Sequence, residues 1–160
     1  MKQASAPKGN QPREGRQISF DELPSYVGYQ VRRTQAKIFG EFLARLGDCE
    51  FTPGSFGVLT LIRANPGITQ VALAAAFGVD KSTMSPVIVR LEKRGLVRRQ
   101  VLESDRRCHG LFFEAAGEAA FLAAREKIRA FEGGVAARLS KAEQKELARL
   151  LQKLQGGEIP

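Results

Sequence analysis

The residues that build redox frameworks and metal centres are scarce in this sequence. Its 160 residues include two cysteines, Cys49 and Cys108, and one histidine, His109. Two cysteines do not make the disulfide framework of a small secreted domain, and a lone histidine supplies no metal-ligand cluster. The glycine-rich phosphate loop and the nucleophile elbow are also missing from the sequence. We therefore expect a protein that is not an enzyme and that holds neither a metal nor a cofactor.

Long apolar runs are absent as well. No stretch approaches the roughly 20 apolar residues of a membrane-spanning helix, and residues 1–17 lack the apolar centre of a secretory signal. We therefore expect a protein of the reducing cytoplasm with no membrane partner. Residues 1–19 are polar and basic and carry glycine and proline, which predicts a disordered tail.

A surplus of positive charge is the first indication of a partner. The chain has 25 lysines and arginines against 17 acidic residues, a net charge of +8. Half of this surplus lies between Asp80 and Arg107, which hold eight basic residues against four acidic ones. Such a segment favours a polyanionic partner, with nucleic acid as the first candidate and a membrane surface as the second.

Apolar residues recur at intervals near 3.6 in several segments, which predicts amphipathic helices. These segments are residues 23–47, 52–67, 68–80, 80–95, 115–139 and 139–154. Favourable N-cap residues start four of them: Thr52, Thr69, Asp80 and Ser140. Glu143 completes a capping box with Ser140, whereas the pair Gly133-Gly134 is expected to bend or break the fifth helix.

The third and fourth helices are joined by a short turn that contains Gly78, which adopts positive φ at no steric cost. Two helices joined in this way indicate a helix-turn-helix. Two β-prone stretches follow, residues 96–102 and 108–114, separated by the polar residues 103–107. They predict a hairpin, and a hairpin directly after a helix-turn-helix is the wing of a winged helix.

Pro86 lies inside the fourth helix, where proline removes a hydrogen bond and crowds the carbonyl four residues back. The helical pattern around it is otherwise clear, and Gly95 suits the position that ends the helix. One face of the helix is apolar: Met84, Val87, Ile88 and Leu91. If the helix begins near Thr83, the proline falls in its first turn, where it is tolerated. If the helix begins at Asp80, a kink near Ser82 is expected.

Taken together, these segments resemble the MarR family of bacterial transcription regulators. The resemblance covers residues 20–154 and is carried by ITQVALAAAFGVDKSTMSPVIVRLEKRGLV, by Asp105-Arg106-Arg107, by FFEAAG and by the last helix. It implies a mainly α fold with a small β-wing, in which N- and C-terminal dimerisation helices flank a winged helix-turn-helix. It also implies a homodimer that represses transcription by binding double-stranded DNA, until a ligand binds or a cysteine is oxidised.

The first and last helices carry apolar stripes that a small DNA-binding module does not need for its own core. Their economical use is to pair with another copy of the chain. The expected organisation is a disordered basic tail over residues 1–19, an N-terminal dimerisation helix over 20–51, a winged helix-turn-helix over 52–114, C-terminal dimerisation helices over 115–155 and a frayed tail over 156–160.

The polar face of the fourth helix is expected to enter the major groove, where the first residues of such a helix reach base edges. Hydroxyl groups exchange hydrogen bonds there, Pro86 and Val89 contact thymine methyl groups, and the cations further along the helix meet phosphates. The predicted DNA-binding residues are Lys81, Ser82, Thr83, Ser85, Pro86, Val89, Arg90, Lys93, Arg106 and Arg107.

At the wing, the resemblance assigns Arg107 to the minor groove, whose negative potential favours a guanidinium. It assigns Asp105 to steadying the wing by pairing with a basic neighbour. Arg98, Arg99 and Arg106 are either phosphate contacts or surface charge.

The chain departs from the family's pattern at two places. Members usually have Leu-Thr where this chain has Phe113-Glu114, and threonine caps the following helix better than glutamate does. Members commonly carry arginine at the position of Pro86 and aspartate at the position of Val89. The changes at Pro86 and Val89 lower the number of hydrogen bonds that the fourth helix, the expected recognition helix, can make with bases. The family's DNA sequence preference therefore does not transfer to this chain.

The resemblance places an effector between the dimerisation helices and the winged helix. The residues expected near that site are Tyr26, Tyr29, Arg32, Arg33, Phe39 and Phe56. Tyrosine together with arginine suits a small aromatic acid or a larger aromatic CoA thioester. The same residues also fit a reading in which the aromatics belong to the core and the arginines are solvated.

Two other functions remain open. One is a cysteine-based redox-sensing repressor: Cys49 lies between two acidic residues, which disfavour a thiolate, whereas Cys108 follows two arginines, which favour one. Redox members of the family mostly place the sensing cysteine in the first helix, where this chain has none. The other is a non-specific architectural DNA-binding protein, which leaves the flanking helices without a role.

Overall fold

The computed structural model describes residues 18–47, 49–102 and 105–157, with the side chains of Asp105 and Arg106 left out of that description. The residues up to Lys37 and those from Ile38 onward form two compact units. Most of the tail predicted over residues 1–19 lies outside the described residues, so that prediction stays untested.

The first unit begins with a short 3-10 helix, η1 (Leu23–Ser25), and continues into the first half of α1 (Val27–Leu46). The sequence predicts one continuous helix from Leu23. The α-helix starts only at Val27 because Tyr26 has an extended backbone, with φ −82° and ψ 122°. Pro24 therefore lies in the 3-10 helix and not in the first turn of the α-helix.

The second unit contains α2 (Pro53–Ala64), α3 (Gln70–Ala76), α4 (Lys81–Lys93), α5 (Glu118–Ala136) and α6 (Lys141–Leu154). The four predicted N-caps are confirmed, because each side chain accepts a hydrogen bond from the backbone amide three residues on: Thr52, Thr69, Asp80 and Ser140. Glu143 closes the predicted capping box at α6. Ser55 closes a second box with Thr52, which the sequence does not predict.

Glycines shape the turns on both sides of α4. Gly78 and Gly95 have φ values of 70° and 67°, as predicted. After α4 the Gly95 amide donates to the Glu92 carbonyl at 2.9 Å and the Leu96 amide to the Leu91 carbonyl at 3.0 Å, which is a Schellman motif. The helix begins at Lys81 with Asp80 as its cap. Of the two alternative starts, the one at Asp80 therefore holds, and Pro86 lies beyond the first turn; the kink expected near Ser82 stays untested.

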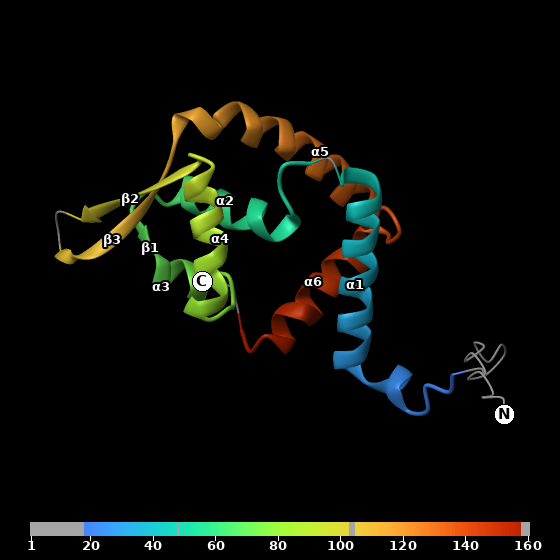
Figure 1. The fold of residues 1–160 in the computed structure, drawn as a ribbon. Helices are drawn as coiled ribbons and strands as arrows, with labels where there is room; N and C mark the ends of the chain where they lie inside the picture. The colour runs from blue at the N-terminus through green and yellow to red at the C-terminus, as the bar shows by residue number, and fades with distance from the viewer. Residues whose placement is uncertain (1–17, 48, 103–104, 158–160) are drawn as a thin grey trace, which may run out of the picture. The chain divides into compact units, whose positions relative to one another are not determined.

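The predicted hairpin is confirmed as β2 (Val97–Leu102) and β3 (Asp105–Phe113), and Figure 1 shows it extending beyond α3 and α4 as a wing. A third strand, β1 (Ile68–Thr69), pairs with β3 and gives the sheet order β1-β3-β2. Gly110 makes this close pairing possible, since a Cβ there would lie 2.8 Å from a backbone oxygen of the segment before β1. The sequence does not predict β1.

One apolar core joins these elements of the second unit. Buried side chains come from α1, α2, α3, α4, the sheet and α5, and they include Phe42, Leu59, Leu73, Ile88, Leu111 and Phe131. The helix α5 follows a 3-10 turn, η2 (Ala115–Gly117), and is shorter at both ends than predicted. It runs through Gly133 and Gly134 without a break, because glycine keeps the amide that donates along a helix. The expected break is therefore wrong, while the alternative of a bend stays untested.

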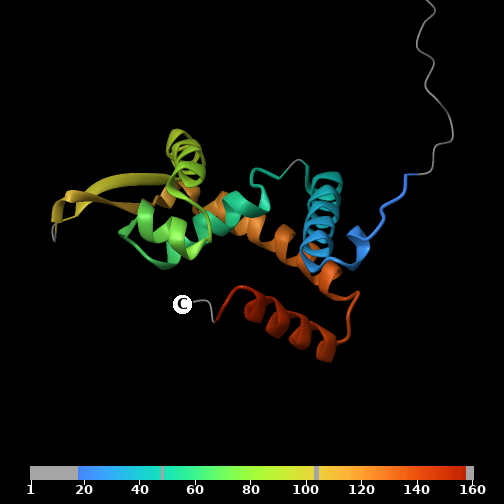
Figure 2. The same cartoon turned by 90° about the horizontal axis from the view of Figure 1, so that it is seen from below.

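The last helix, α6, differs from the others because it has no buried residue. Its apolar side chains Leu147, Leu150 and Leu154 are 45%, 42% and 63% exposed. Figure 2 shows α6 standing apart from α2, α3 and α4. Among the described helices, none combines the length and the apolar content that crossing a membrane requires.

Candidate nucleic-acid interface

The helix α4 has an inner and an outer face. Met84, Ile88 and Leu91 are fully buried in the core. A helix turns by about 100° per residue, so the predicted DNA-binding residues lie on the side away from this core. Of the eight predicted DNA-binding residues on α4, seven are exposed and one, Ser85, is half-buried. The orientation of α4 is thus the one that the sequence predicts, while contact of this face with DNA stays a prediction.

Asp80 fixes the start of α4. Its Oδ1 accepts hydrogen bonds from the Ser82 hydroxyl at 2.5 Å and from the Thr83 amide at 2.6 Å. These bonds, the one from Ser82 first, lower the pKa of Asp80 from its ordinary value of 3.8 to about 2. The carboxylate is therefore ionised at neutral pH, where it holds the hydrogen of the Ser82 hydroxyl.

A polar network connects the wing to both helices of the helix-turn-helix. Arg99 on β2 donates through Nε to Glu92 Oε1 of α4 at 2.8 Å and through Nη1 to Gln70 Oε1 of α3 at 3.1 Å. Gln70 Nε2 donates in turn to the carbonyl of Lys81 at 3.2 Å, at the start of α4. Because these hydrogen bonds meet at Arg99 and Gln70, they help to fix the wing relative to α3 and α4.

Two further arginines of the basic segment have acidic partners. Arg94 donates to the Glu50 carbonyl at 2.9 Å and lies 3.4 Å from the Glu50 carboxylate. Arg98 Nε lies 2.7 Å from Glu114 Oε1. Glu114 makes no side-chain cap for η2. Arg98 and Arg99, which the sequence leaves open between phosphate contact and surface charge, thus both form ion pairs within the protein.

The remaining cations of this segment are divided between α4 and the wing. In the described part of the chain, Lys81, Arg90 and Lys93 are exposed and have no acidic partner. Arg107 is exposed on β3. The side chains of Asp105 and Arg106 lie outside the described residues, so their predicted roles at the wing are not tested. The unpaired positive charge of α4 is therefore on its outer face and flanks.

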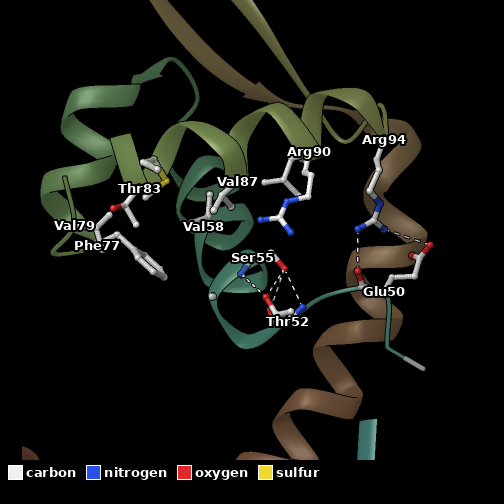
Figure 3. A pocket seen from close by; sticks show the side chains of 13 residues that line it. Glu50, Thr52, Ser55, Val58, Phe77, Val79, Thr83, Val87, Arg90 and Arg94 are labelled. Carbon is white, nitrogen blue, oxygen red and sulfur yellow. Dashed lines mark hydrogen bonds and ion pairs between the residues drawn. The ribbon is translucent and has the colours of Figure 1, made fainter. Parts of the chain in front are cut away.

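A hollow of about 240 Å³ opens between α4, the start of α2 and the turn before α4 (Figure 3). Apolar side chains, among them Val58, Val79 and Val87, form most of its wall. Figure 3 shows the Arg90 guanidinium directed toward Thr52 and Ser55. Because a cavity of about 150 Å³ already holds benzene, this hollow has room for one aromatic ring with a small anionic group.

None of the residues predicted for effector binding lines this hollow. Four of them belong to the first unit. There the Arg33 guanidinium lies 5.8 Å from the centre of the Tyr29 ring, and the Tyr26 hydroxyl donates to Glu22 Oε2 at 2.8 Å. Arg32 is exposed. Tyr29 and Arg33 are neighbours because they lie four residues apart on α1, and their role in effector binding stays a prediction.

The other two residues predicted for effector binding, Phe39 and Phe56, belong to the second unit. Phe39 is exposed, and Phe56 is half-buried. The Phe56 ring stacks on the Phe121 ring, with the ring centres 5.0 Å apart. The Phe113 ring meets the Phe121 ring in a T-shaped arrangement, with the ring centres 5.7 Å apart. For Phe56, this packing favours the reading as a core residue.

The two cysteines are free thiols, and both are half-buried. Cys49 packs beside the apolar core, and Cys108 lies in β3. A sensing thiol requires access to solvent, and both thiols keep part of their surface exposed, so the redox alternative stays untested.

Comparison with known proteins gives consistent results. The model of the MarR family matches residues 51–109. The chain is 36% identical over 147 residues to a putative transcriptional regulatory protein for the hcr operon of Thauera aromatica, and the match covers 90% of this chain and 89% of that protein.

Solved structures agree with this sequence match. The transcriptional repressor CouR bound to a 23-mer DNA duplex has a TM-score of 0.78 and 29% identity, over 88% of this chain and 99% of CouR. CouR bound to p-coumaroyl-CoA has a TM-score of 0.77 and 26% identity, over 87% and 98%. CouR therefore shares the fold of this chain over most of its length.

Proposed function

Since this chain belongs to the MarR family of transcriptional repressors, we propose that it is a homodimer that a small effector releases from a pseudo-palindromic operator. The observation that carries the proposal is the outer face of α4, which presents polar and cationic side chains next to the wing. The DNA-bound structure of CouR supports it. A regulator of this kind acts on the bacterial chromosome, so we assign it to the cytoplasm.

The DNA-binding domain in this proposal is residues 52–114. The outer face of α4 enters the major groove, Arg107 enters the adjacent minor groove, and Arg106 meets phosphates while Asp105 steadies the wing. Residues 20–51 and 115–155 form the dimer. In a two-fold dimer the two recognition helices meet half-sites about 34 Å apart, one turn of the duplex.

The proposal is tested by footprinting and by the salt dependence of binding. A symmetric protected region of defined sequence supports a regulator, whereas equal affinity for every duplex favours the architectural alternative. Lys93→Ala and Arg107→Ala should each weaken operator binding and reduce the slope of log affinity against log salt by about 1. Lys145→Ala, on the polar side of α6, is the matched control and should leave both unchanged.

The dimer is supported by α6. Three of its leucines are more than a third exposed, and no residue of this helix is buried within the chain. Exposed leucines that recur along one helix face are typical of a helix that packs on a partner. A second copy, which carries the same stripe, supplies a matching surface in a two-fold arrangement.

The effector in this proposal is a small aromatic acid or its CoA thioester. The thioester-bound structure of CouR supports this ligand class, and two places in the chain have suitable chemistry. One is the pair Tyr29 and Arg33 of the first unit, with Tyr26 and Arg32 nearby in sequence. The other is the hollow beside α4, which Arg90 lines together with apolar side chains.

A thermal-shift screen of aromatic acids and their thioesters tests the effector, because a ligand that binds only the folded chain raises the melting temperature. Val87→Phe, which fills the hollow, should abolish the shift if the ligand binds there. Arg33→Ala should abolish it if the ligand binds the first unit. Release of DNA by peroxide from the wild type, but not from Cys108→Ser, would instead support the redox alternative.

A further inference from the structure

The outermost residues of α4 form one line along the helix. Ser82, Pro86, Val89 and Lys93 follow one another at intervals of four, three and four residues, which places them on one face. They lie opposite the buried face of Met84, Ile88 and Leu91, and all four are exposed. We name Ser82, Pro86 and Val89 the outer ridge; Lys93 continues it at the far end of the helix.

The outer ridge has no free hydrogen-bond donor. The hydroxyl hydrogen of Ser82 is held by Asp80 Oδ1 at 2.5 Å, so only the lone pairs of that oxygen face outward. Pro86 has no N–H, and neither its ring nor the Val89 side chain has a polar hydrogen. The nearest donors belong to the flanks of the helix, on Lys81, Thr83, Ser85 and Arg90, or to its far end, on Lys93.

Pro86 brings no backbone hydrogen to the ridge either. In a regular helix, the carbonyl of residue 82 receives the amide hydrogen of residue 86. A proline at position 86 has no such hydrogen, and its ring crowds that carbonyl. The hydroxyl oxygen of Ser82 is therefore the acceptor that the ridge presents.

In the major groove, each base presents different donors, acceptors and apolar groups to such a surface. Guanine presents two acceptors, N7 and O6, which a donor-free surface leaves without partners. Adenine presents an amino hydrogen at N6, and thymine presents a methyl group at C5. Cytosine also presents an amino group, but its partner is guanine and it has no methyl group. The A·T pair alone matches both acceptors and apolar surface.

We propose that the outer ridge reads an A·T base pair in each half-site, with the Ser82 hydroxyl oxygen accepting from adenine N6 and with Pro86 and Val89 against the thymine methyl group. This inference rests on the proposed function, because it requires α4 to enter the major groove. It makes Ser82, Pro86 and Val89 specificity-determining residues, while the flanking cations supply affinity that does not depend on sequence.

The test begins with operators selected by the full-length protein from a random duplex library. In the selected operator, each thymine is replaced in turn by uracil, which lacks only the methyl group, and each adenine by purine, which lacks only the amino group. At one pair per half-site, uracil should lower affinity about fourfold, as expected for one buried methyl group. Purine should lower it about fivefold, as expected for one hydrogen bond.

Variants assign these losses to residues. Ser82→Ala should bind the purine and adenine duplexes equally well. Val89→Ala should reduce the uracil loss, because Pro86 alone then remains against the methyl group. Pro86→Arg adds donors and should shift the selected base from adenine or thymine to guanine. Val71→Ala, an exposed valine on α3, is the control and should show the wild-type losses at both positions.

The outcomes separate the two proposals. If no duplex is enriched from the library, the proposed function fails and this inference fails with it. If an operator is enriched but the base analogues change nothing, or if Ser82→Ala and Val89→Ala keep the wild-type losses, the regulator stands and the outer ridge is overturned as the reader. Selected half-sites with G·C at the position that Pro86→Arg alters overturn it equally.

Discussion

The helices α4 and α6 have the same amphipathic construction and opposite surroundings. In α4 the side chains of Met84, Ile88 and Leu91 are completely buried by the rest of the winged helix, and the exposed side carries hydroxyl groups and cations around Pro86 and Val89. In α6 the apolar face is itself the exposed one. The difference indicates what each helix lacks: α4 needs a polar, anionic partner for its outer face, and α6 needs an apolar one.

The largest effect is expected from Leu150→Asp on α6. In the proposed dimer the leucine is buried once in each copy, at about 2 kcal/mol each, so its loss should raise the dimer dissociation constant roughly a thousandfold. Operator binding should fall with it. Light scattering over a range of concentrations measures the dimer. Gln152→Glu adds a carboxylate to the other side of α6 and should change neither property; an intact Leu150→Asp dimer would contradict the role given to α6.

The next effect is expected from Ile88→Ala on α4, because Ile88 is completely buried. The cavity left behind should lower the free energy of unfolding by about 3 kcal/mol, measured by denaturant titration. Leu150→Ala, studied at concentrations where the chain is monomeric, should cost well under 1 kcal/mol. Equal losses for the two variants would remove the contrast between the helices.

A smaller effect is expected from substitutions of Arg99, whose hydrogen bonds link the wing to α3 and α4. Arg99→Ala should lower stability by about 1 kcal/mol and weaken operator binding by roughly tenfold. Arg99→Lys should recover little of either, since an ammonium group cannot bridge Glu92 and Gln70 as the planar guanidinium does. Arg129→Ala, an exposed arginine of α5, is the control. Full recovery by lysine would mean that charge alone is needed at this position.

The smallest effect concerns the start of α4 and depends on pH. The pKa of Asp80 is lowered from 3.8 to about 2 in the folded chain, so its stabilising contribution is present above pH 3.8 and is lost as the pH falls toward 2. Asp80→Asn imitates the protonated side chain. The melting temperature of the wild type should therefore exceed that of the variant near neutral pH, and the two should converge near pH 2. A constant difference across this range would assign the effect to something other than the ionisation of Asp80.

The parts of the fold that were predictable from the sequence depend on local chemistry. Asp80 and Thr69 were recognisable as caps because the capping hydrogen bond spans three residues, and Gly78 and Gly95 because positive φ favours glycine. The hairpin was recognisable from two β-prone stretches. The short strand β1 was not, since two residues are too few to show an alternating pattern, and its partner lies on β3, more than 40 residues later.

The candidate site also has a part that was predictable from the sequence and a part that was not. The outer face of α4 was predictable because the helical period alone fixes which residues oppose Met84 and Ile88. The roles of Arg98 and Arg99 were not, because their acidic partners are brought to them by the turn at Gly95 and by the end of β3. The hollow beside α4 was also unpredictable, since its lining comes from separate helices and turns whose distances no local pattern encodes.

The network at Arg99 has a consequence for how binding energy is distributed. Loops that order only when they meet a partner lose conformational entropy at that moment, and affinity falls accordingly. Arg99, Gln70 and Glu92 restrict the wing and the recognition helix when the chain folds. These hydrogen bonds thus preorganise the winged helix. In the proposed complex it would lose little conformational entropy on binding DNA, so it would favour duplexes whose shape already fits it.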